Sequence, residues 1–147
     1  MSNEANKYVI PSESLEVVEA ILNRCEIIKE KTPKILEVVK YHEDKNEKLE
    51  VEIECKIIQD ADALDAIGKI GLKRTLNYCR SKNVPISNND YSLDCQEYIP
   101  NINPISTCHY ICRTMIPNSK NLHTSTAKDL AKGKIKILER FVERNTK

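Results

Sequence analysis

The chain has 147 residues, 40% of them hydrophobic and 31% charged, which suffices for one compact core and predicts a single domain over residues 1–147. Its 23 Lys and Arg residues nearly balance its 22 Asp and Glu residues, so net charge gives no reason to expect nucleic acid as a partner. Only 5% of the residues are aromatic and only 3 are glycine, which argues against an all-β fold with its many tight turns. No apolar run reaches the roughly 18 residues that span a bilayer, so we expect a cytoplasmic protein and no membrane partner.

The first half of the chain shows apolar residues at helical spacing. Ser12–Glu30 predicts an amphipathic helix, and Thr32 with Pro33 opens a second helix that runs to His42. A charged connector follows, at residues 43–50. From about Val51 the apolar positions resume, and their spacing predicts one long helix to about Tyr78.

The second half begins with a change of composition. Residues 81–104 are rich in Asn, Ser, Pro and Asp and show no periodicity, which predicts an irregular loop. We expect a helix at Ile105–Ile116, a break at Pro117–His123 and a final helix at Ser125–Arg144. The predicted fold class is therefore all-α, a compact helical array.

The final predicted helix is basic. From Lys120 to Lys147 the chain has eight Lys and Arg residues and three Asp and Glu residues. Such a surface is usually only solvated, and its charge suits the negative end of the helix dipole. Binding of polyphosphate or RNA by this helix is the weaker alternative.

Three carboxylates lie within an otherwise apolar part of the third predicted helix. Asp62 and Asp65 are three residues apart and share one helix face, while Asp60 points elsewhere. Buried carboxylates are costly unless they are paired, so we expect water, a cation or basic side chains beside them. From spacing alone, exposure to water or pairing with Lys73 or Arg74 is favoured over a metal.

Several segments resemble one known family. Residues 55–80 read CKIIQDADALDAIGKIGLKRTLNYCR, which is similar to the late motif of the HD-domain superfamily of metal-dependent phosphohydrolases, D-A-D-x-L-D-A-I-G followed by an Arg-Thr pair. Ser81–Pro85 resembles the family's Ser-Lys-Gly-x-Pro turn, and Asn121–Lys128 resembles its Leu-Met-x-Thr-x-Thr-Ala-Lys segment. With a shorter match at His109 and Tyr110, the resemblance extends from about residue 37 to residue 144.

The resemblance implies a metal-dependent phosphohydrolase that acts on a phosphorylated small molecule or nucleotide. It implies that Asp62 is the last protein ligand of a divalent metal, which could be Mn, Fe, Ni, Zn or Mg. Asp65 would then support the site from one turn along the same face. It also implies a metal-site role for His42, for which an ordinary histidine at a helix end is an equal alternative.

Four further residues are candidates for contact with substrate phosphate. Arg74 could reach a phosphate or pair with Asp65. The other three match polar positions of the family, with a partly exposed polar residue as the favoured alternative: His109, Arg113 and Lys128.

The family's early His and its adjacent His-Asp pair have no counterpart in this chain. The sequence has no His-Asp dipeptide and only three histidines, His42, His109 and His123. Because these early motifs are missing, the chain resembles the C-terminal portion of an HD domain that is N-terminally incomplete. One carboxylate cannot hold a catalytic metal alone.

This incompleteness leaves two hypotheses. In one, another chain or an upstream segment completes a phosphohydrolase. In the other, the chain is a catalytically inactive helical remnant that acts as an oligomeric or interaction module. In both, the apolar faces of an incomplete array predict a homo-oligomer or a complementing chain.

Overall fold

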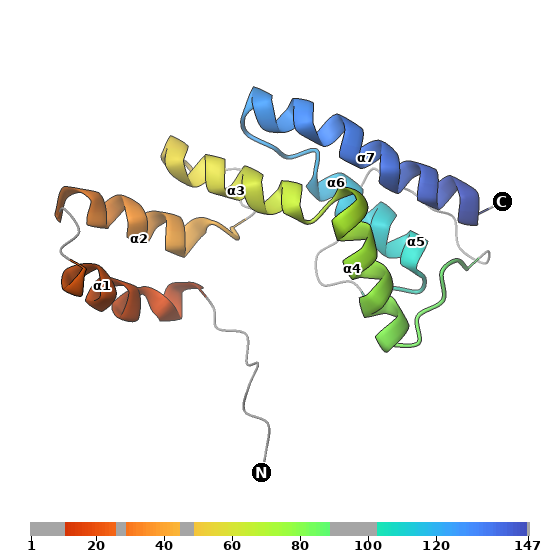
Figure 1. Ribbon diagram of the computed structural model, residues 1–147, viewed down its shortest axis with the longest axis horizontal. Coiled ribbons are helices and arrows are strands. Elements are labelled where there is room, and N and C mark those ends of the chain that lie inside the picture. The colour runs from red at the N-terminus through yellow and green to blue at the C-terminus, as the bar shows by residue number, and fades with distance from the viewer. Residues whose placement is uncertain (1–10, 26–28, 45–48, 89–102, 147) are drawn as a thin grey trace, which may run out of the picture. The chain divides into compact units, whose positions relative to one another are not determined.

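The computed structural model describes residues 11–25, 29–44, 49–88 and 103–146, and every regular element within them is helical (Figure 1). The predicted all-α fold class is therefore confirmed. The residues group into two compact units, which we call unit 1 (Met1–Gln59) and unit 2 (Asp60–Lys147). Their boundary falls inside one helix, α3 (Ile53–Asp65). Within the described ranges, none of the helices combines the length and the apolar composition that crossing a membrane requires.

Unit 1 contains two short α-helices, each preceded by a 3-10 turn. The turn η1 (Pro11–Ser14) leads into α1 (Leu15–Arg24), and η2 (Lys29–Lys31) leads into α2 (Thr32–Tyr41). The helix predicted over Ser12–Glu30 therefore ends earlier, at Arg24, and residues 26–28 lie outside the described part. The second helix begins where predicted, with a proline in its first turn. The two helices pack against each other, yet neither contains a buried residue.

Unit 2 contains the end of α3 and a set of helices that pack on α7 (Ser125–Asn145). The helix α4 (Gly68–Ser81) follows α3 after a short break. Residues 82–88, 103 and 104 are not helical, as predicted for this loop, and residues 89–102 lie outside the described part. Ile105 and Ser106 are not helical either, although the next helix was predicted to begin at Ile105. A helical run then has three parts: α5 (Thr107–Tyr110), the π-helix η3 (Ile111–Met115) and α6 (Ile116–Asn118). Both α4 and this run contact α7 (Figure 1).

The core of unit 2 forms where these helices meet. Small and aliphatic side chains dominate it, which lets the helix backbones approach closely. Its buried members include Ala63, Ile67, Cys108, Ile111, Cys112, Ile116, Ala127, Ala131 and Leu138. Of the apolar stripe predicted for the last helix, Leu138, Phe141 and Val142 face this core, whereas Leu130 is exposed and the alanines at 127 and 131 face the core instead. The predicted bounds of that helix differ from the observed ones by one residue.

The single helix predicted over Val51–Tyr78 is wrong, because the chain breaks between α3 and α4. Ile67 is extended (φ −118°, ψ 176°) and Gly68 has a left-handed backbone with φ +76°. Only glycine adopts this conformation without strain. The break redirects the chain while Ile67 stays in the core, so the apolar spacing continues across two helices and imitates one.

The helical run at 107–118 also differs from the prediction. It begins at Thr107, after Ser106, whose hydroxyl accepts a hydrogen bond from the His109 N–H (3.1 Å). It continues through Pro117 to Asn118, where a break was predicted. The proline lies at the start of α6, and the lack of an N–H group is tolerated there.

Candidate functional site

A pocket of about 300 Å³ lies in unit 2, between the end of α3, the first half of α4 and the 107–118 run. Its wall combines apolar residues such as Ile67 and Met115 with a group of polar side chains. The polar members are Asp62, Asp65, Arg74, Thr75, Tyr110, Thr114 and Asn118. Asp62 and Asp65 thus share one face, as their spacing predicts, and Arg74 joins them.

Arg74 pairs with Asp65 across the break between α3 and α4. Its Nη2 lies 2.6 Å from Oδ2 of Asp65 and donates to the backbone oxygen of the same residue at 2.5 Å. Both side chains are more than half exposed, so the pair contributes at most about 1 kcal/mol to stability. Because both contacts use one nitrogen, the other N–H groups of the guanidinium are not used by Asp65.

Thr114 was not among the residues predicted from sequence. It lies in the π-helix η3 and lines the pocket, and its Oγ1 is buried with no hydrogen-bond partner among the described residues. Buried hydroxyls are normally satisfied, and single π-turns occur often at functional sites. No local sequence pattern marks this position, because it depends on how the 107–118 run folds against α4.

Asp60 is buried on another side of α3, at 3% exposure, and connects this helix to the start of α7. Its Oδ1 accepts from the His123 N–H (2.7 Å), and its Oδ2 accepts from the Thr124 N–H (2.8 Å) and Oγ1 (2.7 Å). Burial opposes ionisation most strongly, but the hydrogen bonds from His123 and Thr124 together outweigh it and lower the pKa of Asp60. Asp60 is therefore an ionised structural anchor, apart from the pocket.

Three predicted phosphate-contact residues lie outside the pocket lining. His109 and Arg113 are half-buried in the 107–118 run, and Lys128 is exposed on α7. Burial, followed by the positive charge of Arg113, lowers the pKa of His109, so this imidazole is neutral at pH 7. Its Nδ1 is buried without a hydrogen-bond partner in the described part of the chain.

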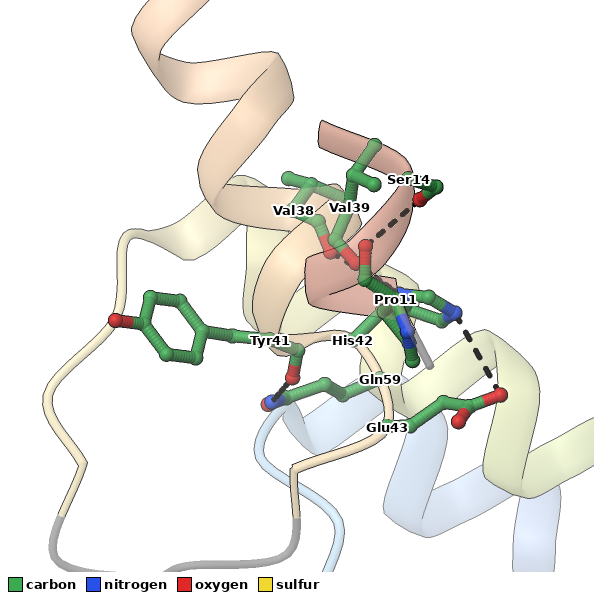
Figure 2. A network of polar contacts seen from close by, with 8 residues as sticks. All are labelled: Pro11, Ser14, Val38, Val39, Tyr41, His42, Glu43 and Gln59. Carbon is green, nitrogen blue, oxygen red and sulfur yellow. Dashed lines mark hydrogen bonds and ion pairs between the residues drawn. The ribbon is translucent and has the colours of Figure 1, made fainter. Parts of the chain in front are cut away.

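His42 belongs to unit 1 and ends α2 (Figure 2). Its Nδ1 lies 2.9 Å from the carbonyl oxygen of Val39 and 3.2 Å from that of Val38, and its Nε2 lies 3.8 Å from a carboxylate oxygen of Glu43. Because carbonyl oxygens only accept, Nδ1 carries the proton. His42 therefore caps the C-terminal carbonyl groups of α2, where a positive charge is also favoured by the helix dipole.

Gln59 completes the same network in unit 1. Its side-chain amide donates to the carbonyl oxygens of Tyr41 (2.7 Å) and Asp44 (3.3 Å), so the end of α2 is attached to α3 (Figure 2). Both predicted metal residues thus have a defined place, His42 at the end of α2 and Asp62 in the pocket of unit 2.

The described residues do not fit a metal centre by themselves. Among them, no group of three or more His, Cys, Asp or Glu side chains is arranged to hold an ion. Catalytic metal sites generally need three protein ligands. The pocket contributes two carboxylates, Asp62 and Asp65, of which Asp65 contacts Arg74, so the described lining falls short of three ligands.

The chain is similar to several solved structures, whereas no family model and no curated protein matches it. An HD-superfamily hydrolase from Bacillus thuringiensis is 24% identical over 97% of this chain and 63% of its own, with a TM-score of 0.67. A protein from Listeria innocua is 30% identical over 92% and 65% of the two chains, with a TM-score of 0.70. Bacillus subtilis YpgQ in complex with ADP is 20% identical over 89% and 59%, with a TM-score of 0.67.

This chain spans less than two thirds of the length of each of these three proteins. The similarity nevertheless covers at least 89% of this chain, and it includes a protein described as an HD-superfamily hydrolase. The sequence resemblance and the structural similarity therefore agree, and the chain has an all-α, HD-domain-like fold.

Proposed function

We propose that the pocket of unit 2 is the phosphate-ester site of an HD-domain-type phosphohydrolase that is incomplete as a single chain. The observation that carries the proposal is the presence of Asp62, Asp65 and Arg74 around one pocket. Phosphohydrolysis requires a cation or guanidinium for the phosphate and a polar wall for the rest of the substrate. The pocket meets both requirements, because Arg74 supplies a guanidinium and the hydroxyl of Thr114 contributes to the polar wall.

In this proposal Arg74 is the phosphate-binding residue. Its guanidinium reaches the pocket and keeps N–H groups that Asp65 does not use. The substrate class is a phosphorylated small molecule or nucleotide, and the complex of YpgQ with ADP supports a nucleoside diphosphate as a probe.

A divalent metal enters the proposal only if its site is completed from elsewhere. Asp62 would supply one carboxylate, and the other ligands would come from another chain or from residues outside the described part. A carboxylate with imidazole partners would suit Mn, Fe, Ni, Zn or Mg. In this proposal the described residues of unit 2 bind and orient the phosphate, and hydrolysis requires the completed metal site.

The proposal predicts that ADP binding depends on Arg74. In calorimetric titrations, Arg74→Gln should weaken ADP binding by about 10-fold to 100-fold, the worth of a charge-assisted hydrogen bond to phosphate. The matched control is Arg80→Gln, which removes the same charge from an exposed residue of α4 that does not line the pocket. Equal ADP affinity in both variants would show that the pocket is not the phosphate site.

Mn²⁺ titrations test the carboxylate in the same way. We expect the single chain to bind Mn²⁺ weakly. Its Mn²⁺ affinity should fall at least about 10-fold in Asp62→Asn and should be unchanged in Asp129→Asn. Asp129 is an exposed carboxylate on α7, outside the pocket. If both variants bound Mn²⁺ like the original chain, Asp62 would not be a metal ligand.

The second candidate function, an oligomeric or interaction module, is favoured by a feature of unit 1. Neither α1 nor α2 contains a buried residue, and helices this short need packing to be stable. An apolar pocket of about 470 Å³ is lined by Ile35, Val38 and Val39. Its rim carries two acidic residues, Glu30 and Glu54, and two basic ones, Lys31 and Lys34.

We propose that a second copy of this chain covers the apolar pocket of unit 1. Lys34 and Glu54 already pair with each other at 2.8 Å, which leaves Glu30 and Lys31 as the two opposite charges that a two-fold symmetric partner would meet. Light scattering should therefore show a dimer that dissociates in Val38→Glu. The matched control is Val17→Glu, at an exposed position of α1 outside the pocket, which should remain dimeric. A monomer, or a dimer that only Val17→Glu dissociates, would contradict this interface.

A further inference from the structure

Charge is distributed unequally between the two units. Unit 1 has 9 Lys and Arg residues against 13 Asp and Glu residues, a net charge of −4, whereas unit 2 has 14 against 9, a net charge of +5. Together they give the +1 of the whole chain. The near-neutral net charge of the chain is therefore the sum of an acidic unit and a basic unit. Such an asymmetry of charge is typical of proteins with an anionic partner.

Much of the positive charge of unit 2 lies in one row along α7. Every fourth residue of this helix is basic over four successive turns, and all five are exposed. We call this row the basic ridge: Lys128, Lys132, Lys136, Arg140 and Arg144. Residues four apart are neighbours on a helix surface, so the five side chains form a continuous row. The row winds around α7 by about 160°, because each step of four residues turns it by about 40°.

The basic ridge lies on the side of α7 that faces away from the core. The buried residues of this helix are Ala127, Ala131, Leu138 and Val142. With a rotation of 100° per residue, these four cluster about one direction, and the centre of the ridge lies roughly opposite. Packing therefore orients the ridge toward solvent.

Only one residue of the basic ridge forms an ion pair in the described part of the chain, although Glu139 and Glu143 are exposed on the same side of α7. Lys132 pairs with Asp129 at 2.7 Å, but both side chains are more than 70% exposed, and such a pair is weak. The other four ridge residues form no ion pair within the described part of the chain. Four cations are thus available to a ligand, and a fifth is weakly engaged.

The dimensions of the ridge suit a chain of phosphates. Four helical residues rise about 6 Å and the whole ridge spans about 24 Å along the helix axis, so positive charges repeat at a short, regular interval along a row that winds around α7. An extended nucleic acid strand presents one phosphate per nucleotide in the same regular manner. We propose that the basic ridge of α7 binds the phosphate backbone of a single-stranded nucleic acid, without reading its bases.

Two observations favour a nucleic acid backbone over a membrane surface and over base recognition. The apolar face of α7 is buried in the core of unit 2, and Leu130 is the one large hydrophobic residue that this helix exposes, which is too little to insert among lipids. The one aromatic residue of α7, Phe141, is partly buried and packs against the core, so its ring is engaged there and not presented for base stacking. Binding therefore rests on phosphate contacts alone and is independent of the function proposed for the pocket.

Salt dependence is the first measurement. Fluorescence anisotropy with an oligodeoxythymidine of about 20 nucleotides should show affinity falling about 100-fold between about 50 and 200 mM salt, as expected for five phosphate contacts on a single strand. Binding that did not weaken with salt, or no binding at about 50 mM salt, would overturn the proposal.

A matched pair of variants tests the location. The ridge variant carries Lys128→Gln, Lys136→Gln, Arg140→Gln and Arg144→Gln, and the control carries Lys69→Gln, Lys73→Gln, Lys82→Gln and Lys120→Gln, all exposed residues of unit 2. Both lose four charges, and glutamine preserves helix propensity. With one contact left, the ridge variant should lose only about 3-fold in affinity over the same salt range, while the control keeps the steep dependence.

Three outcomes would contradict the assignment. Equal loss in both variants would mean that net charge, not the ridge, binds the strand. Tighter ridge-dependent binding of inorganic polyphosphate than of the oligonucleotide would identify polyphosphate as the ligand. Ridge-dependent binding to phosphatidylserine vesicles, with oligonucleotide binding unchanged in the ridge variant, would identify a membrane surface instead.

Discussion

Replacing Asp60 with asparagine is expected to destabilise unit 2 by about 3 kcal/mol, because a buried charged acceptor would be lost. The two carboxylate oxygens of Asp60 accept three hydrogen bonds, from two backbone N–H groups and one hydroxyl. Asparagine keeps one oxygen and turns an NH₂ group toward the remaining donors. At least one donor at the start of α7 would then be buried without a partner.

Urea unfolding monitored by circular dichroism measures this loss. Asp129→Asn is the matched control, because it removes a carboxylate from an exposed position of unit 2 whose only described partner is Lys132. We expect the control to unfold at the original urea concentration. An equal midpoint for Asp60→Asn would mean that the contact between Asp60 and residues 123–124 does not stabilise the fold.

The same contact predicts a pH dependence. Because folding lowers the pKa of Asp60, the stabilisation is fully present above the unfolded value of about 3.9 and is lost as the pH falls through the folded value. The stabilities of the original chain and of Asp60→Asn should therefore converge in acid. A difference that stayed constant down to about pH 2 would show that the carboxylate charge is not responsible.

Gly71→Ala is the second substitution with a large expected effect. A Cβ at Gly71 would overlap the backbone carbonyl group of Ala66, and neither backbone can move unless the turn between α3 and α4 opens. We expect a loss of more than about 3 kcal/mol, because overpacking against backbone is relieved only by shifting the helices. The end of α3 carries Asp62 and Asp65, so the pocket would be disrupted as well.

Two other glycines provide graded comparisons. At Gly133, in the middle of α7, a Cβ would meet no atom within 4 Å, so Gly133→Ala should stabilise the helix by about 0.5 to 1 kcal/mol. Gly68→Ala should be intermediate, because its φ of +76° is strained for alanine and its Cβ would lie 3.1 Å from the flexible side chain of Lys134. In thermal unfolding, Gly133→Ala should be the most stable of the three variants, Gly68→Ala intermediate and Gly71→Ala the least stable. A Gly71→Ala protein as stable as Gly133→Ala would contradict the turn geometry.

The break at Gly68 shows why periodicity alone failed in the third predicted helix. Ile67 is a core residue on the extended side of the turn, so apolar positions continue at helical spacing although the helix does not. Lys134 of α7 donates to the carbonyl oxygen of Leu64 (2.9 Å) and so satisfies one of the last carbonyl groups of α3. That contact joins residues 70 positions apart, and no local pattern reveals it.

Among the charged residues, too, some features follow from local helical geometry and others depend on contacts between distant parts of the chain. The shared face of Asp62 and Asp65 follows from helical geometry, and in the structure both line one pocket. The partners of Asp60 lie 63 and 64 residues along the chain, so its role as an anchor could not be read from its neighbours. The basic row of α7 is visible in the sequence, but its orientation toward solvent depends on which face packs.

The sequence by itself determined the all-α class, the bounds of α7 and the common face of Asp62 and Asp65, because these depend on interactions within one or two helical turns. Only the tertiary structure decided the break at Gly68, the anchoring of α7 by Asp60, the unpartnered hydroxyl of Thr114 and the exposure of the basic ridge. Each of these depends on contacts between residues far apart in the chain, and the free energy of such contacts is set by packing, not by local propensity.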